Sequence, residues 1–148
     1  MNQCADLYVR RPDGSPVAIV EVKGGKDLSR DDATYMRQAL LSRCPGTTAP
    51  FFLMVSQDTG FLWIDSQQRP DAPPSYEFPL NKIVSRYLPD LKATDRLRHS
   101  ELQLLYLHWL SDLSRSARRA EDEPEISLAE AGFLKAIEGA RVTAEELV

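Results

Sequence analysis

Cysteine and long apolar runs are both scarce in this sequence. Its two cysteines, Cys4 and Cys44, do not make a disulfide framework, and nothing nearby gives them metal-ligand spacing. We therefore expect reduced thiols that serve as small apolar side chains. The longest apolar run, Phe51–Val55, is far shorter than the roughly 20 residues of a membrane-spanning helix. No basic and then apolar leader follows Met1, so we expect a cytoplasmic protein without a secretory signal.

The composition is typical of one soluble globular domain. The chain has 148 residues, of which 43% are hydrophobic and 27% are charged, and this is too apolar for a disordered protein. A net charge of −4 argues against a protein whose whole surface binds nucleic acid. Much of the acidity lies in residues 121–125. The N-terminal half is more basic, which is compatible with a polyanionic substrate.

The first part of the chain alternates between strand-type and helix-type patterns, which indicates an α/β fold. Residues 17–22 are β-branched and apolar on both faces, which predicts a central strand covered on both sides. Ser29 is a candidate helix N-cap, with Asp32 at the capping-box position. The expected elements are a hairpin of strands 6–11 and 17–22, a helix over 30–43, and strands 51–56 and 61–65.

The rest of the chain is predicted to be a linker followed by helices. Residues 66–79 contain four prolines and are expected to be a loop. Apolar residues at helical spacing follow this loop, and they predict helices over 80–88, 94–120 and 127–138. We therefore expect an α/β core in residues 1–65 and a helical extension in residues 80–148 that packs on it, within a single domain.

The longest of these helices, over residues 94–120, is more apolar between Leu102 and Leu113 than one sheet face requires. Its surplus apolar side chains either pack internally or form a surface for a dimer or a partner protein. We expect His108, which lies within this apolar stretch, to be packed, and His99 to be exposed.

Three charged residues of the predicted hairpin are expected to meet at one end of the sheet. Glu21 and Lys23 share a face because side chains alternate along a strand. A turn centred after Gly14 would place Tyr8 opposite Glu21 and Asp6 opposite Lys23, with Asp6 diagonal to Glu21 at roughly 7–8 Å. Burying these charges without a ligand would be costly, and a hard divalent cation between the two carboxylates would offset that cost.

The pattern of Asp6 followed by Glu21-x-Lys23 resembles that of the PD-(D/E)XK, or restriction-endonuclease-like, nuclease superfamily. The hallmark of that family is an Asp, a variable gap and then (Asp/Glu)-x-Lys on a β-hairpin. The resemblance covers about residues 5–65. The apolar residues on either side of the motif are similar to those in the nuclease part of type I restriction subunits and RecB-like proteins. The family core begins with a helix and a strand before the hairpin, and the fold expected here lacks both.

The resemblance implies a magnesium- or manganese-dependent endonuclease or other DNA hydrolase, in bacterial restriction, repair or defence. Asp6 and Glu21 would be metal ligands, and the backbone carbonyl of Val22 would be a further one. Lys23 would act as the catalytic cation that orients or polarises the attacking water. Gln38, on the following helix, would support the site. DNA would be the partner, and cleavage of RNA instead of DNA stays open.

Other interpretations of the same residues also stay open. The charged residues of the hairpin could form a cross-strand ion pair at a solvated sheet end. Three basic residues could contact phosphates or lie on a solvated helix face: Lys26, Arg30 and Arg37. The whole chain could be a catalytically inactive nuclease-like module that acts as a scaffold through its C-terminal helices.

Overall fold

The computed structural model describes residues 4–24, 28–46, 48–64, 69–92, 94–116 and 121–144. Over these residues the protein has an α/β fold with a six-stranded mixed sheet and five helices. In chain order the elements are β1 (Leu7–Arg10), β2 (Pro16–Val22), α1 (Arg30–Arg43), β3 (Phe51–Val55), β4 (Thr59–Ile64), β5 (Tyr76–Pro79), α2 (Asn81–Tyr87), α3 (His99–Arg115), α4 (Glu125–Glu130), α5 (Phe133–Ile137) and β6 (Arg141–Thr143). The predicted opening series of strand, strand, helix, strand and strand is confirmed.

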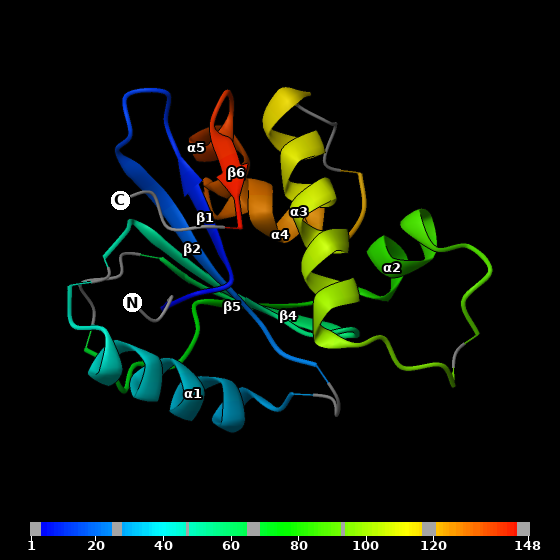
Figure 1. The fold of residues 1–148 in the computed structure, drawn as a ribbon, viewed down its shortest axis with the longest axis horizontal. Coiled ribbons are helices and arrows are strands. Elements are labelled where there is room, and N and C mark those ends of the chain that lie inside the picture. The colour runs from blue at the N-terminus through cyan, green and yellow to red at the C-terminus, as the bar shows by residue number, and fades with distance from the viewer. Residues whose placement is uncertain are drawn as a thin grey trace.

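The sheet lies between two layers of helices (Figure 1). Its strand order is β5-β4-β3-β2-β1-β6. The β2–β3 pair is parallel, and the other neighbouring pairs are antiparallel. α1 covers one face, over a core that includes Phe52 and Trp63. Helices α2 to α5 cover the other face, over a larger core that includes Trp109 and Phe133. β2 lies inside the sheet and is buried from Val17 onward, as its apolar sequence predicts.

The hairpin forms as predicted, but its register differs by two residues. Leu7 pairs with Val20, so the same register continued by one residue puts Asp6 opposite Glu21 rather than opposite Lys23. The turn is centred earlier than expected, because the amide of Gly14 donates to the carbonyl of Arg11 and leaves Pro12-Asp13 as the central residues. Proline is favoured at this turn position. A shift of two residues leaves each side chain on the same face of the sheet, and it brings Asp6 and Glu21 closer together than predicted.

α1 begins and ends where the sequence indicates. The side chain of Ser29 accepts a hydrogen bond from the amide of Asp32 and caps the helix. Its buried face includes Arg37, whose guanidinium lies over the rings of Phe52 and Trp63 at 5.6 and 5.3 Å from their centroids. The interpretation of Arg37 as a phosphate contact or a solvated residue is therefore wrong. Of the other two basic residues, Arg30 donates to the carbonyl of Pro74, and Lys26 lies outside the described residues.

The predicted linker over residues 66–79 contains a strand. β5 pairs antiparallel with β4 at the edge of the sheet, so the expectation of a loop is wrong for Tyr76–Pro79. The prolines in this region led to the prediction of a loop. An edge strand nevertheless tolerates a residue without an amide proton, and Pro79 is the last residue of β5.

Gly60 in β4 is expected to be intolerant of a side chain. It lies opposite Phe78 of β5, and a Cβ at Gly60 would overlap the Phe78 ring. Because Phe78 is only 2% exposed, the ring has little room to move. Gly60→Ala is therefore expected to lower the free energy of unfolding by about 1–3 kcal/mol. Urea denaturation measures this. Gly46→Ala, at a position where a Cβ would meet nothing within 4 Å, is the control, and equal stability of the two variants would contradict the account.

The long helix predicted over residues 94–120 begins only at His99. The rest of the C-terminal extension is helical, with two further corrections. The single helix predicted over 127–138 is divided into α4 and α5 at Gly132, whose positive φ of 82° interrupts the helix. The second correction is β6, which pairs with β1 and completes the sheet. Three residues are too few for an alternation pattern to be visible in the sequence. Residues 117–120 of the predicted long helix lie outside the described residues.

The apolar surplus of α3 packs mainly inside the molecule. The residues that face the sheet are buried: Leu102, Leu105, Tyr106, Trp109, Leu110 and Leu113. Leu104 is exposed, and so is His108, which corrects the expectation that His108 is packed. Among the described residues, no helix combines the length and the apolar character that crossing a membrane requires.

The two cysteines form a disulfide, so the expectation of reduced thiols is wrong. Cys4 precedes β1 and Cys44 caps the end of α1, with a sequence separation of 40 and 6.1 Å between their Cα atoms. A cysteine count cannot predict this contact, since it depends on how α1 returns across the sheet. The disulfide lies at the same end of the sheet as Asp6 and Glu21.

Candidate active site

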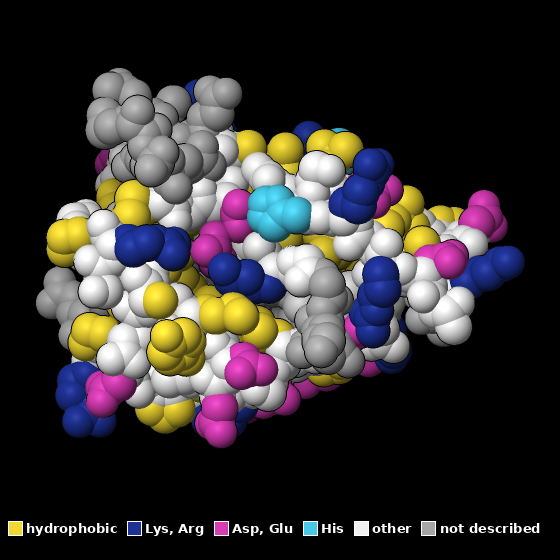
Figure 2. All heavy atoms as spheres, turned by 60° about the horizontal axis from the view of Figure 1, so that its bottom comes forward, with side chains coloured by type: hydrophobic (Ala, Val, Ile, Leu, Met, Phe, Trp, Pro, Cys, Tyr) yellow, Lys and Arg dark blue, Asp and Glu magenta, His cyan; other side chains and the backbone are white. Residues whose placement is uncertain are grey.

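A pocket of about 630 Å³ opens where β2 ends. Its walls come from the segment before β1, the end of β2, the last turn of α1 and the start of α3. The charged and polar side chains of these walls belong to Asp6, Glu21, Lys23, Arg43, His99 and Gln103. Figure 2 shows acidic side chains beside a histidine near the middle of this face, with Lys and Arg side chains on both sides of them. The predicted meeting of Asp6, Glu21 and Lys23 at one sheet end is confirmed.

Asp6 is held by both its backbone and its side chain. Its amide donates to the carbonyl of Val20 at 3.1 Å, and its Oδ2 accepts from the amide of Val22 at 2.7 Å. From α3, Nε2 of His99 contacts Oδ1 of Asp6 at 3.0 Å, and Gln103 donates to the Asp6 carbonyl at 3.3 Å. The carboxylate is thus fixed over the end of β2.

Glu21 and Asp6 share a buried electrostatic environment. Glu21 is 7% exposed, and burial together with the neighbouring Asp6 carboxylate raises its pKa to about 8. Burial also acts on Asp6, but hydrogen bonds from Glu21 and the Val22 amide, with His99 nearby, lower the pKa of Asp6 below its ordinary value. Near neutral pH the metal-free pair therefore holds one proton, on Glu21.

Lys23 supplies the positive charge beside this pair. Its Nζ lies 3.3 Å from Oε2 of Glu21, and its side chain is 31% exposed toward the pocket opening. The amide of Lys23 donates to the carbonyl of Val55 at 2.8 Å, which continues the pairing of β2 with β3. The backbone of Lys23 is thus fixed in the sheet, and its ammonium group is open to an incoming ligand.

His99, Gln103 and Arg43 belong to the pocket, and the sequence interpretation did not assign them to it. His99 begins α3, about ninety residues after Asp6. Gln57, in the β3–β4 turn, fixes the approach to α3, since its side chain donates to the carbonyl of Asp95 and accepts from the amide of Leu97. No local pattern signals this long-range contact.

The structure brings most of the predicted site residues together, and Gln38 is the exception. Val22 lines the pocket, whereas Gln38 is exposed on α1 and does not line it. The buried positions of α1 are Ala33, Arg37 and Leu40, which place Gln38 on another side of the helix. Asp13 lies in the hairpin turn, where it accepts from Ser15, in agreement with its interpretation as a turn residue.

Comparisons with known proteins add no family to this geometry. No protein-family model matches the chain, and no significant match was found among curated proteins or solved structures. A functional assignment therefore comes from the residues and their arrangement.

The carboxylates of the pocket are possible ligands for a divalent metal ion. Among the described residues, no group of three or more His, Cys, Asp or Glu is arranged to hold a metal ion. Magnesium needs fewer protein ligands than that, since it is commonly bound by one or two carboxylates and keeps several waters. The Asp6–Glu21 pair fits this requirement, and a cation there would replace the proton on Glu21.

Proposed function

We propose that the protein is a nuclease of the restriction-endonuclease-like type, which hydrolyses DNA phosphodiester bonds with magnesium or manganese. The observation that carries the proposal is the buried Asp6–Glu21 pair, with Lys23 beside it at the mouth of an open pocket. A buried pair of carboxylates without a cation is electrostatically unfavourable, and this cost supports a metal-binding role. The proposed setting is the cytoplasm of a bacterial cell, in restriction, repair or defence.

Each residue of the pocket has a distinct role in this proposal. Asp6 and Glu21 would hold the metal, with the carbonyl of Val22 as a further ligand. The metal, when bound, supplies a Lewis acid that lowers the pKa of water and neutralises charge on the phosphate. Lys23 stabilises the negative charge that develops on the scissile phosphate. Arg43, an exposed residue that lines the same pocket, provides a charge for a neighbouring phosphate of the strand.

The proposal is tested by incubating the oxidised protein with supercoiled plasmid and with single-stranded DNA. Cleavage is expected with magnesium or manganese and is expected to stop with a chelator. Asp6→Asn is expected to abolish cleavage, and Asp13→Asn, in the exposed hairpin turn, is the matched control. No cleavage of either DNA by the wild type would contradict the proposal, and cleavage of RNA alone would reassign the substrate.

His99 is expected to support the metal ligand Asp6. His99→Ala removes the contact at 3.0 Å to Oδ1 of Asp6 and is expected to weaken manganese affinity by about tenfold. The matched control is His108→Ala, since His108 is exposed on the same helix and does not line the pocket. Calorimetric titration measures both, and unchanged affinity in His99→Ala would show that this contact does not position the carboxylate.

The alternative of a catalytically inactive scaffold has less support. It required a free apolar surface on the helix between Leu102 and Leu113, and most of those side chains are buried against the sheet. A smaller groove of about 280 Å³ remains between α2 and α3, beside Leu88 and Leu104. A scaffold also gives no reason for a buried acidic pair beside a lysine. The nuclease is therefore the preferred function.

A further inference from the structure

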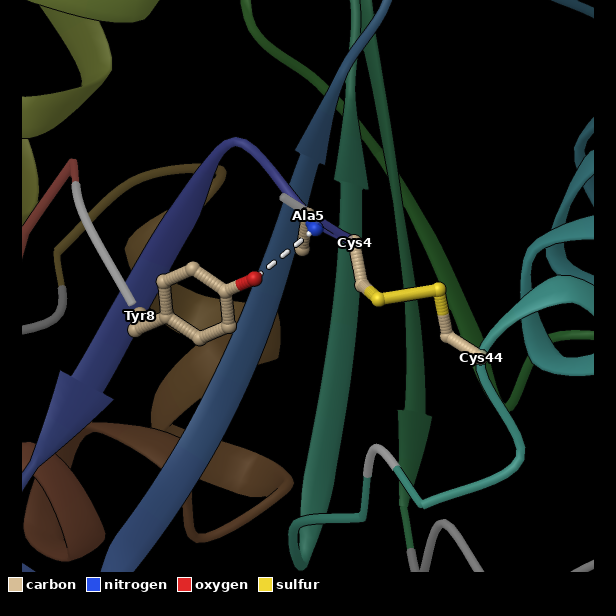
Figure 3. Close-up of a disulfide and its surroundings, with 4 residues drawn as sticks. All are labelled: Cys4, Ala5, Tyr8 and Cys44. Atoms are coloured by element: carbon tan, nitrogen blue, oxygen red, sulfur yellow. Dashed lines mark hydrogen bonds between the residues drawn. A yellow bond between two sulfur atoms is a disulfide. The ribbon is translucent and has the colours of Figure 1, made fainter. Parts of the chain in front are cut away.

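We propose that the Cys4–Cys44 disulfide is a redox latch that positions the two sides of the acidic pocket. In the oxidised chain it joins the segment that carries Asp6 to the end of α1, and its reduction separates them. This inference rests on the proposed metal site, since it concerns how tightly that site binds a cation. Figure 3 shows the disulfide between the segment before β1 and the end of α1.

The disulfide is built into the pocket on both sides. Cys4 itself lines the pocket, two residues before Asp6. Cys44 is the C-cap of α1 and directly follows Arg43, which also lines the pocket. One covalent bond therefore sets the separation between the carboxylate side and the basic side of the pocket.

Apart from the disulfide, the end of α1 is held against the sheet by the apolar packing of Leu40 and Leu41. Three of its 14 residues are buried, namely Ala33, Arg37 and Leu40, and Leu40 is the nearest of these to Cys44. The amide of Cys44 donates to the carbonyl of Leu40, but this bond is internal to the helix end and does not reach the sheet. Without the disulfide, the apolar packing of Leu40 and Leu41 remains, and the last turn of α1 with Arg43 is expected to be held less tightly relative to Asp6.

A hydrogen bond also orients the segment that contains Cys4. The amide of Ala5 donates to the hydroxyl of Tyr8 at 2.9 Å, as Figure 3 shows, and both residues are 4% exposed. This bond and those of Asp6 keep the hairpin folded in either redox state, whereas the exact position of Asp6 also depends on Cys4, two residues before it. Reduction is therefore expected to widen the pocket and loosen the acidic site without unfolding the hairpin.

The opening step is a thiol–disulfide exchange with a dithiol reductant. The dithiol supplies two electrons and two protons, the bond between the two sulfur atoms breaks, and Cys4 and Cys44 each gain a proton. The reductant becomes a disulfide. Because dithiol reductants keep most cytoplasmic thiols reduced, the latch would close the pocket only under oxidising conditions.

The latch is tested by titrating manganese into the oxidised protein and into protein that was reduced with dithiothreitol and then desalted without oxygen. Reduction is expected to weaken affinity by about tenfold, as loss of outer-shell support does. Reoxidation is expected to restore it. The double variant Cys4→Ser/Cys44→Ser is expected to match the reduced protein and not to respond to reductant. Far-UV circular dichroism at 10 °C establishes that each sample is folded.

The outcomes separate this inference from the proposed function. Equal affinity in folded oxidised and reduced protein would overturn the latch and leave the metal site standing. No manganese binding by the oxidised protein would overturn both. Hydrogen exchange gives an independent test, because reduction is expected to speed exchange at the last turn of α1 and not at Leu53, which is buried inside the sheet on β3. Unchanged exchange at α1 would also overturn the latch.

Discussion

Lys23→Ala is expected to lower the rate of metal-dependent DNA cleavage by about 100- to 1,000-fold, as the loss of one group that stabilises developing charge does. Lys23 is suited to this role because its ammonium lies 3.3 Å from Glu21 and is partly open to the pocket. Manganese affinity is expected to change by less than about tenfold, since both carboxylates remain. Single-turnover cleavage with saturating protein separates the two effects.

The matched control for Lys23→Ala is Lys135→Ala. Lys135 is exposed on α5 and does not line the pocket, so its removal changes the net charge equally. Lys23→Arg is expected to recover part of the rate because it restores the positive charge. If Lys23→Ala and Lys135→Ala cleave DNA equally fast, Lys23 is a structural partner of Glu21 and not part of the reaction.

The stability of the metal-free protein is expected to fall as the pH rises from about 5 to 8. Glu21 binds a proton with a pKa of about 8 in the folded chain, against an ordinary value of 4.5, owing first to burial and then to Asp6. This proton stabilises the folded state fully below the unfolded pKa, and the contribution is lost as the pH rises through the folded pKa. At about 1.4 kcal/mol per pK unit, the loss is at most about 5 kcal/mol.

Urea denaturation in the presence of a chelator, at several pH values, measures this loss. The pH dependence of stability that comes from Asp6 has the opposite sign. Because the pKa of Asp6 is lowered in the folded chain, its stabilising contribution is lost only in acid, below about pH 4. Glu21→Gln is expected to remove most of the dependence between pH 5 and 8 and to be more stable than the wild type at pH 8. Identical pH profiles for the two proteins would show that Glu21 is not buried as described.

Elements with strong local signals could be predicted from the sequence. β2 is apolar on both faces, and α1 begins at a serine cap, so both were predicted within a residue or two. β5 was missed because Pro79 and the prolines that precede the strand indicate a loop, and β6 because three residues show no period. The hairpin register depended on the position of one turn, and placing that turn too late in the chain displaced the pairs of Leu7, Tyr8 and Val9 by two residues.

The candidate site could be predicted only where its residues are close in sequence. Asp6, Glu21 and Lys23 lie on one hairpin, so strand alternation and pairing bring them together. His99 and the Cys4–Cys44 disulfide depend on where α3 begins and where α1 ends in space. Those positions follow from packing across the whole sheet, which residue spacing does not encode.

The central claim is that Asp6 and Glu21 hold a divalent cation, and calorimetric titration of manganese into the oxidised protein tests it most directly. The wild type is expected to bind manganese at one site, more tightly at pH 8 than at pH 6, because binding displaces the proton on Glu21. Glu21→Gln is expected to lose binding, and Glu138→Gln, at an exposed position outside the pocket, to retain it. No binding by the wild type, or equal binding by Glu21→Gln, would contradict the account.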